Sequence, residues 1–296
     1  MQQTFLYTLI VLFVLQACGD NNMAEEKSRR TTDFNTGWRF MLGDNPRASV
    51  ESFDDASWQE LNFPHDWIIK ADAPGEIGWY RKTFTPPVTD KGKQTYIEFN
   101  GFYLNSIAWI NGQLLDEAPR ENTSFRYNLT PHLRYGQKNT IALRVDNGWQ
   151  RASHRQSDSC INHSVRLVTV HPLHIAHCGT CVTTENVSAQ SAGIILRVTL
   201  ENTTQKMYNA ELISVVKDAD GKVKAKVASL VSIQKEGQKE TVQAMTLENP
   251  QLWSDAKPYM YTITTQVVAD GRVIDEYDTP LSVCSVDLAG FPKENY

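Results

Sequence analysis

The sequence has no excess of basic residues and no apolar run of membrane-spanning length, and each shortage excludes a class of protein. Its 29 Lys and Arg are outnumbered by 34 Asp and Glu, and the net charge of −5 builds no sequence-wide cationic field, which argues against a nucleic-acid-binding protein. Its apolar residues are not gathered into the repeated long runs of a multi-pass membrane protein. Hydrophobic residues make up 41% and charged residues 21% of the chain, a balance that excludes disorder and collagen and is typical of a globular protein.

Aromatic residues, in contrast, are plentiful. The chain has 7 Trp, 11 Tyr and 11 Phe, and such side chains suit β-sandwich cores and sugar-facing surfaces. Its 296 residues are about twice the usual domain length, so we expect two domains.

The N-terminus has the pattern of an export signal. Residues 5–15 form an apolar run of signal-peptide size, and the following Leu15-Gln16-Ala17-Cys18 resembles the lipobox of bacterial lipoproteins. We therefore expect residues 1–18 to be a lipoprotein signal peptide with Cys18 as its lipid anchor, and residues 19–32 to be a polar tether. This predicts an exported protein, a periplasmic or cell-surface lipoprotein of a Gram-negative bacterium, held to the membrane by its N-terminal lipid. An ordinary secretory signal with a coincidental Cys is the alternative.

The rest of the chain reads as short strands and tight turns. In the first half, strand-length apolar or alternating runs are expected at 96–99, 106–110, 140–145 and 165–170. Asn111-Gly112 predicts a tight hairpin turn, because both residues tolerate positive φ angles. No stretch has the pattern of a long amphipathic helix with caps at both ends, so the sequence predicts an all-β protein.

A boundary is expected near His171-Pro172. Beyond it, six strands are predicted within about 110 residues, at 194–200, 210–217, 223–231, 241–247, 259–268 and 272–277. Their number and spacing are typical of an immunoglobulin-like sandwich. The Cys-Trp-Cys pattern of antibody domains is missing.

Several phrases are distinctive in combination. In chain order they are Phe34-Asn-x-x-Trp38-x-Phe40, Phe53-Asp54-Asp55-x-x-Trp58, Phe63-Pro64-His65-Asp66-Trp67, Gly78-Trp79-Tyr80-Arg81-Lys82-x-Phe84, Trp109-Ile110-Asn111-Gly112 and Asn139-x-Ile-Ala-Leu-Arg-Val-Asp146-Asn147. Together they resemble the N-terminal sugar-binding jelly roll of glycoside hydrolase family two, the group of β-galactosidases, β-glucuronidases and β-mannosidases, and its Bacteroidetes β-galactosidase-like members above all. The second half resembles that family's immunoglobulin-like domain, through Asn249-Pro250-x-Leu252-Trp253-Ser254 and Pro258-Tyr259-x-Tyr261.

The resemblance implies a domain organisation. A jelly roll at 33–172 would be followed by an immunoglobulin-like sandwich at 173–285, and residues 286–296 would begin a truncated linker to a (β/α)8 barrel. In the family, that barrel carries the two catalytic glutamates, the acid/base within an Asn-Glu pair. This sequence contains no Asn-Glu dipeptide, so we expect no catalytic residue in it.

Three residues are candidates for binding sugar, namely Asp66, Trp79 and Arg81. Buried core aromatics are the commoner role of Trp in sandwiches, and Asp66 could accept a hydrogen bond from Arg81 that fixes its loop. The family resemblance instead implies that this loop edge reaches toward the sugar site of a neighbouring barrel.

The stretch Ser153–His163 departs from the family's pattern. Two glycines are replaced by Asp158 and Cys160, and a Cys at position 284 stands where the family has Arg. All these replacements are single-base changes, which suggests relaxed selection on a truncated gene.

A cluster of His and Cys residues is the densest set of metal-type ligands in the chain. It runs from His171 through His174 and His177 to the Cys178-x-x-Cys181 pair. A structural zinc, a local disulfide and free thiols are the alternatives, but alternate residues of a strand point to opposite faces, and so we expect neither a metal nor a cofactor here. The pairing of Cys160, Cys178, Cys181 and Cys284 stays open, since four cysteines allow three connectivities.

These observations predict the non-catalytic N-terminal part of a β-galactosidase-like family-two glycosidase, inactive alone, with a β-galactoside-type glycan as its ligand. A lipid-anchored carbohydrate-binding module and a docking module for a separately encoded catalytic barrel are the alternatives.

Overall fold

A computed structural model describes residues 28–65, 77–99, 105–117, 125–146 and 164–284. Within these ranges the regular structure is β-strand, apart from three short 3₁₀ turns at Pro46–Ser49, Val88–Asp90 and Thr130–His132. The predicted all-β class is confirmed. No helix in the described part of the chain is long and apolar enough to cross a membrane.

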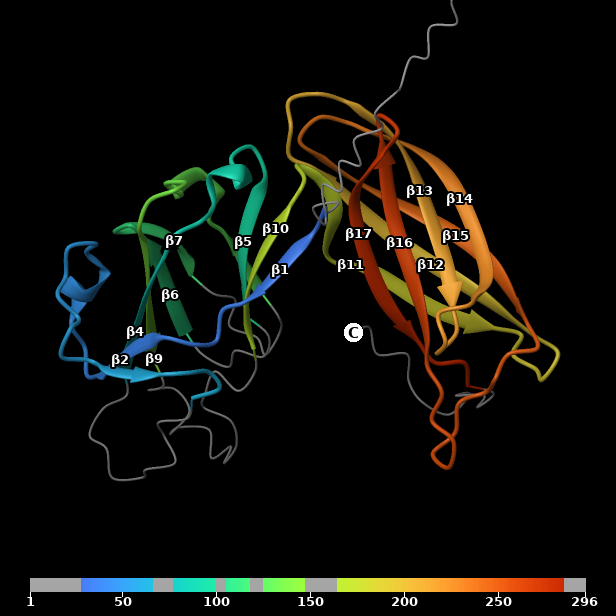
Figure 1. Cartoon of the computed structure of the whole chain (residues 1–296), viewed down its shortest axis with the longest axis horizontal. Coiled ribbons are helices and arrows are strands. Elements are labelled where there is room, and N and C mark those ends of the chain that lie inside the picture. Colours follow the sequence, from blue (N-terminus) through green and yellow to red (C-terminus); the bar gives the residue numbers. More distant parts are fainter. Residues whose placement is uncertain (1–27, 66–76, 100–104, 118–124, 147–163, 285–296) are drawn as a thin grey trace, which may run out of the picture.

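The first sandwich consists of two antiparallel sheets (Figure 1). One sheet has the order β1 (Arg30–Asp33), β10 (Val165–Val170), β5 (Gln94–Phe99) and β8 (Phe125–Asn128). The other has the order β3 (Gln59–Leu61), β2 (Trp38–Leu42), β4 (Ile77–Phe84), β9 (Asn139–Asp146), β6 (Asn105–Ile110) and β7 (Gln113–Glu117).

The core of this sandwich follows from the alternation of its strands. On β5, Ile97 and Phe99 point between the sheets and are fully buried, and on β9 Ile141 and Leu143 do the same from the opposite sheet. Because successive side chains point to opposite faces, the intervening residues form the two outer faces of the sandwich.

The second sandwich has seven strands. Its three-stranded sheet has the order β11 (Leu173–Glu185), β12 (Ser191–Asn202) and β15 (Gly237–Glu248). Its four-stranded sheet has the order β14 (Val223–Ile233), β13 (Tyr208–Lys217), β16 (Tyr261–Ala269) and β17 (Arg272–Leu281). Alternate residues of both sheets form one core, and the three-plus-four arrangement is that of an immunoglobulin-like fold.

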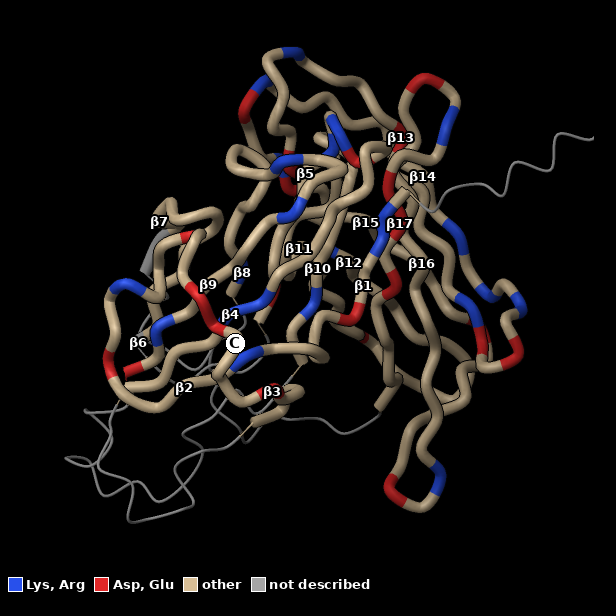
Figure 2. The backbone as a smooth tube through the Cα atoms, turned by 60° about the vertical axis from the view of Figure 1, so that its left-hand side comes forward, with Lys and Arg blue, Asp and Glu red and all other residues tan. Residues whose placement is uncertain are grey.

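Strand β1 differs from the expectation for the N-terminal segment. It begins at Arg30, inside the range predicted to be a tether, because Arg30–Asp33 pair with Thr169–Arg166 of β10. The signal peptide, Cys18 and most of the tether lie outside the described residues, as do Asp66 and residues 286–296, so the predictions for them stay predictions. Lys and Arg are scattered among Asp and Glu over both sandwiches (Figure 2).

Candidate functional site

The outer face of the six-stranded sheet is the first place to look for the predicted sugar-binding residues. Trp79 and Arg81 alternate with the core residue Tyr80 on β4, so both point away from the core. The segment from Asp44 to Trp58, which we call the cover segment, packs over them and makes a second small core with Ala142 of β9.

Trp79 lies beneath the cover segment. It is 1% exposed, its indole Nε1 donates to Asp44 Oδ1 over 3.0 Å, and its ring stacks on that of Trp109 with centroids 5.2 Å apart. The expected core role of the tryptophans is also seen at Trp38, which is fully buried. Trp79 therefore has a structural role, and its role in binding sugar stays a prediction.

Arg81 is the main fastening of the cover segment. Its side chain is 2% exposed, and its Nε donates to Asp55 Oδ2 over 2.8 Å. Its two terminal nitrogens donate to backbone carbonyl oxygens of the same segment, those of Ala48, Val50, Glu51 and Phe53. Asp55 is thus the carboxylate that Arg81 contacts among the described residues. The expected contact with Asp66 lies outside the described residues and stays a prediction.

An open cluster of charged residues lies at one end of the same face. Arg144 donates from Nε and Nη2 to the two carboxylate oxygens of Asp44, both over 3.1 Å, and from Nη1 to Asp146 over 3.3 Å. We call Asp44, Arg144 and Asp146 the strand-end cluster. Their side chains are 37%, 21% and 34% exposed, so solvent reaches all three.

The sheet itself positions this cluster. Asp146 ends β9 and pairs with Ile77, the first residue of β4, and with Asn105, the first residue of β6. Three strand ends therefore meet beside the cluster. Arg144 pairs with Trp79 two positions further along β9 and β4, on the same face of the sheet. Two carboxylates and a guanidinium offer acceptors and donors for sugar hydroxyls, and Trp109, which stacks on the buried Trp79, is the partly exposed aromatic ring of this face.

The contacts within the cluster stabilise the ionised form of Asp44. The hydrogen bonds from Arg144, with a smaller contribution from the Trp79 indole, hold the pKa of Asp44 below its usual value. Asp44 is therefore ionised at neutral pH and acts as an acceptor.

Sequence reasoning named none of these three residues as a site. The spacing of Arg144 and Asp146 placed both on one face at the end of a predicted strand, which was an available signal. Asp44 gave no signal, because it is 100 residues from Arg144 and only the cover segment brings the two together.

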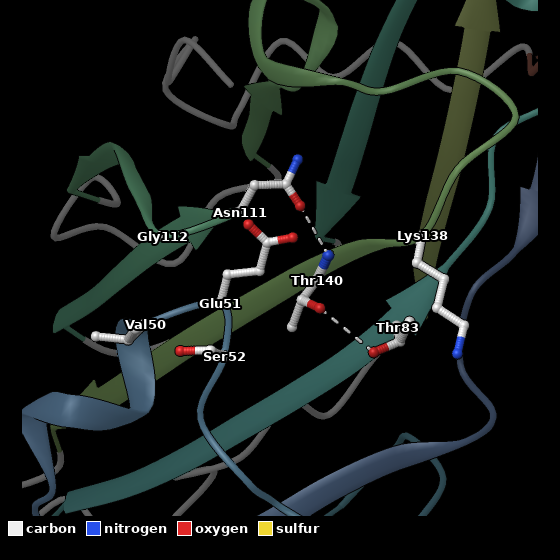
Figure 3. Close-up of a pocket in the computed structure, with 8 residues that line it drawn as sticks. All are labelled: Val50, Glu51, Ser52, Thr83, Asn111, Gly112, Lys138 and Thr140. Carbon is white, nitrogen blue, oxygen red and sulfur yellow. Dashed lines mark hydrogen bonds between the residues drawn. The ribbon is translucent and has the colours of Figure 1, made fainter.

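A polar groove lies at the other end of the strands (Figure 3). It has a volume of about 620 Å³, and it is lined by Val50, Glu51, Ser52, Thr83, Asn111, Gly112, Lys138 and Thr140. Thr83 and Thr140 join their hydroxyls across β4 and β9 over 3.4 Å, and Asn111 Oδ1 accepts from the Thr140 amide over 3.0 Å. Thr83 lies four residues after Trp79, about 13 Å along β4, so this groove is separate from the strand-end cluster. No aromatic side chain lines it.

The His and Cys cluster of the sequence lies on β11 and does not converge. His174 is fully buried. Cys178, Cys181 and Cys284 are free thiols; the first two are exposed and Cys284 is half-buried. A shift of register between Ile175 and Thr180 separates the histidines from the second Cys. Within the described residues, no three His, Cys, Asp or Glu side chains are arranged to hold a metal ion.

Comparison with known proteins gives a consistent result. Residues 173–281 match the model of the glycosyl hydrolases of family 2. A β-galactosidase of Bacteroides ovatus is 38% identical over 93% of this chain and 34% of its own length. A β-glucuronidase of Formosa agariphila is 32% identical over 88% of this chain and 30% of its own length.

Solved structures agree with these relatives. A family-2 glycosyl hydrolase of Bacteroides cellulosilyticus superposes with a TM-score of 0.79 at 30% identity, over 86% of this chain and 36% of that one. A family-2 β-glucuronidase superposes with a TM-score of 0.81 at 29% identity, over 87% of this chain and 30% of that one. The resemblance found in the sequence is thus confirmed, and this chain, which spans about a third of the length of these relatives, belongs to glycosyl hydrolase family 2.

Proposed function

We propose that this chain is a non-catalytic part of a family-2 glycosidase that acts on β-galactoside-type glycans. One observation carries the proposal. The relatives named β-galactosidase and β-glucuronidase match 93% and 88% of this chain, but the chain covers only 34% and 30% of their length. The shared part is the pair of sandwiches, which we propose supports the sugar site and supplies residues at its edge.

The chemistry of the strand-end cluster fits a binding role. A retaining glycosidase needs one carboxyl group that is protonated and donates to the leaving oxygen, and its pKa is raised for that purpose. Asp44 has the opposite character, since the bonds from Arg144 lower its pKa. A charged Asp44 accepts hydrogen bonds from sugar hydroxyls and does not donate a proton.

The first test is hydrolysis by the purified chain. We expect no release of nitrophenol from a chromogenic β-galactoside above the buffer rate, with an intact family-2 β-galactosidase as the positive control. Turnover that persists through further purification would contradict the non-catalytic assignment.

The second test is sugar binding at the strand-end cluster. We expect titration calorimetry with a methyl β-galactoside to show millimolar affinity, and Arg144→Met to weaken it by about tenfold or more through the loss of charge-assisted hydrogen bonds. Arg197→Met is the matched control, since Arg197 also lies in a partly exposed ion pair, with Glu240 on the second sandwich at 3.3 Å.

Two outcomes of this titration count against the binding role. Equal affinities of the wild type and Arg144→Met would remove the cluster from the site. No heat at millimolar sugar would favour the alternative of a docking module for a separately encoded catalytic barrel.

A further inference from the structure

The two sandwiches meet along a surface, which we call the seam, that combines charged side chains with a small apolar cluster of Tyr96, Val168 and Val170. One side of the seam is the outer face of the four-stranded sheet of the first sandwich. On this face, Tyr96 and Glu98 alternate with the core residues Ile97 and Phe99 of β5. On the other side of the seam lie β11, β12 and β17 (Figure 1).

An ion pair and a histidine–carboxylate contact cross the seam. Arg126 of β8 donates to Glu201 of β12 over 2.7 Å, and its guanidinium also lies over the Tyr96 ring at 3.9 Å. His177 Nδ1 lies 3.1 Å from Glu98 Oε1, again between one sandwich and the other. All four side chains are 15–22% exposed, so both contacts are largely shielded from water.

A second ion pair brings in the chain just before β1. Arg29 donates from Nε and Nη2 to the carboxylate of Asp275 over 2.9 and 2.7 Å, and from Nη2 to the Ile175 carbonyl oxygen over 2.7 Å. Asp275 is fully buried and also accepts the Ile175 amide over 2.7 Å. The N-terminal segment therefore straps the first sandwich to β11 and β17 of the second.

His174 lies within this set of charges. It is fully buried, its Nε2 is 3.6 Å from Glu201 Oε2, and its ring centroid is 5.9 Å from that of Tyr96. Neither ring nitrogen has a well-formed hydrogen bond among the described residues. The titratable and charged groups packed at the seam are Arg29 before β1, Tyr96 and Glu98 on β5, Arg126 on β8, Arg166 on β10, His171, His177 and Cys178 on β11, Glu201 on β12, and Asp275 and Tyr277 on β17.

We propose that the seam is an acid-sensitive joint, which is closed while His174 is neutral and opens when His174 takes up a proton. A third positive charge is unfavourable there, because His174 is enclosed away from water beside Arg126 and Arg29, and the nearby Glu201 carboxylate is already paired with Arg126. The joint sets the angle at which the first sandwich, and with it the strand-end cluster, is held against the second.

The size of the effect follows from linkage. Burial, followed by the charges of Arg126 and Arg29, lowers the pKa of His174 to about 3. In an open joint the ring would regain a pKa of about 6.5, so the open form binds more protons below pH 6.5. Opening is therefore favoured by about tenfold for each pH unit below 6.5, until the pH nears the lowered pKa.

Protonation of Glu98 also favours opening of the joint, at a lower pH than protonation of His174. His177 contributes most to holding the pKa of Glu98 below its usual value, against the effect of burial. The charged carboxylate thus favours the closed joint, and this contribution is lost as the pH falls below about 4.5.

Hydrogen exchange of the whole chain at pH 7.5 and 5.5, corrected for intrinsic rates, tests the proposal. We expect protection of residues 173–178, where the Ile175 amide is bonded to the Asp275 that Arg29 holds, to fall about tenfold at pH 5.5. Residues 94–99, which are paired within their sheet to β10 and β8, and residues 194–200 inside the second core should keep their protection. In His174→Phe this response should vanish. His132→Phe, which alters a histidine away from the seam, should keep it.

Two results would overturn the joint. One is equal protection of residues 173–178 of the wild type at both pH values, and the other is a response in His174→Phe that equals that of the wild type. If His174→Phe has lost its fold at pH 7.5 by circular dichroism, His174→Gln replaces it as the variant that cannot take a proton, and the same two results apply.

Discussion

At the scale of single residues, Arg81 shows how one buried charge organises a segment that has no strand of its own. The cover segment lacks a ladder partner, and its carbonyl oxygens would remain unsatisfied against the sheet. The Arg81 guanidinium supplies donors to four of them and an ion pair to Asp55. A planar group with five N–H donors is suited to this role, which lysine does not fill.

We therefore expect Arg81→Met to lower the free energy of unfolding by about 3–5 kcal/mol, since it removes the buried donor of Asp55 and a donor from four carbonyl oxygens, of which that of Val50 keeps the Phe53 amide. Urea unfolding measures this loss, and limited proteolysis should find new cuts between Asp44 and Trp58. Arg39→Met is the comparison. Arg39 also reaches Asp55, through its carboxylate at 3.7 Å and its carbonyl oxygen at 2.9 Å, but it is 38% exposed, so we expect a smaller loss. Equal losses in the two variants would show that the burial of Arg81 adds nothing to the fastening of the segment.

At the scale of elements, the hairpin between β6 and β7 links the sheet to the turn before β9. Asn111 and Gly112 have φ angles of 52° and 79°, as the Asn-Gly pair predicts for a tight turn. Asn111 is also 9% exposed and bonds through its side chain to the Thr140 amide, the His132 carbonyl oxygen and the Asn139 side chain. The turn residue is therefore also a buried connector.

We expect Asn111→Ala to lower the free energy of unfolding by about 2–4 kcal/mol, from the positive φ and from buried groups that lose their partners. The matched control is Asp270→Ala in the hairpin between β16 and β17, where φ is 50° but the side chain is exposed. The difference between the two losses, measured by chemical denaturation, isolates the buried bonds. A difference near zero would mean that only the turn geometry matters.

At the scale of the whole molecule, the two sandwiches have separate apolar cores, and the contact between them joins ion pairs to a small apolar cluster of Tyr96, Val168 and Val170. Shielded ion pairs are satisfied in one arrangement, and removing one partner is costly. The ion pairs therefore favour one angle between the sandwiches, and the buried His174 makes that angle sensitive to pH.

Much of the fold was predictable because the determining signals are local. Strand β10 was expected at residues 165–170 and lies there, and the six strands expected in the second half were each found within a few residues of their predicted ends. Strand β1 was not predicted, since Arg30–Asp33 are polar and become a strand only by pairing with β10.

The candidate site was less predictable, for a physical reason. The sequence singled out Trp79 and Arg81 by their motif, but a motif does not tell a buried fastening from an exposed contact. Arg81 is 2% exposed because the cover segment folds over it.

The sequence by itself determined the all-β class, the tight turns and the family, because alternation, Asn-Gly pairs and motif order are properties of neighbouring residues. Only the tertiary structure decided which charges meet. Asp44 joins Arg144 across 100 positions, and Arg29 joins Asp275 across 246. Such pairs depend on sheets that bring distant strands together. At Asp275, which is fully buried, the fold also excludes water, and the attraction between the charges is stronger there than at the solvent-exposed Asp44.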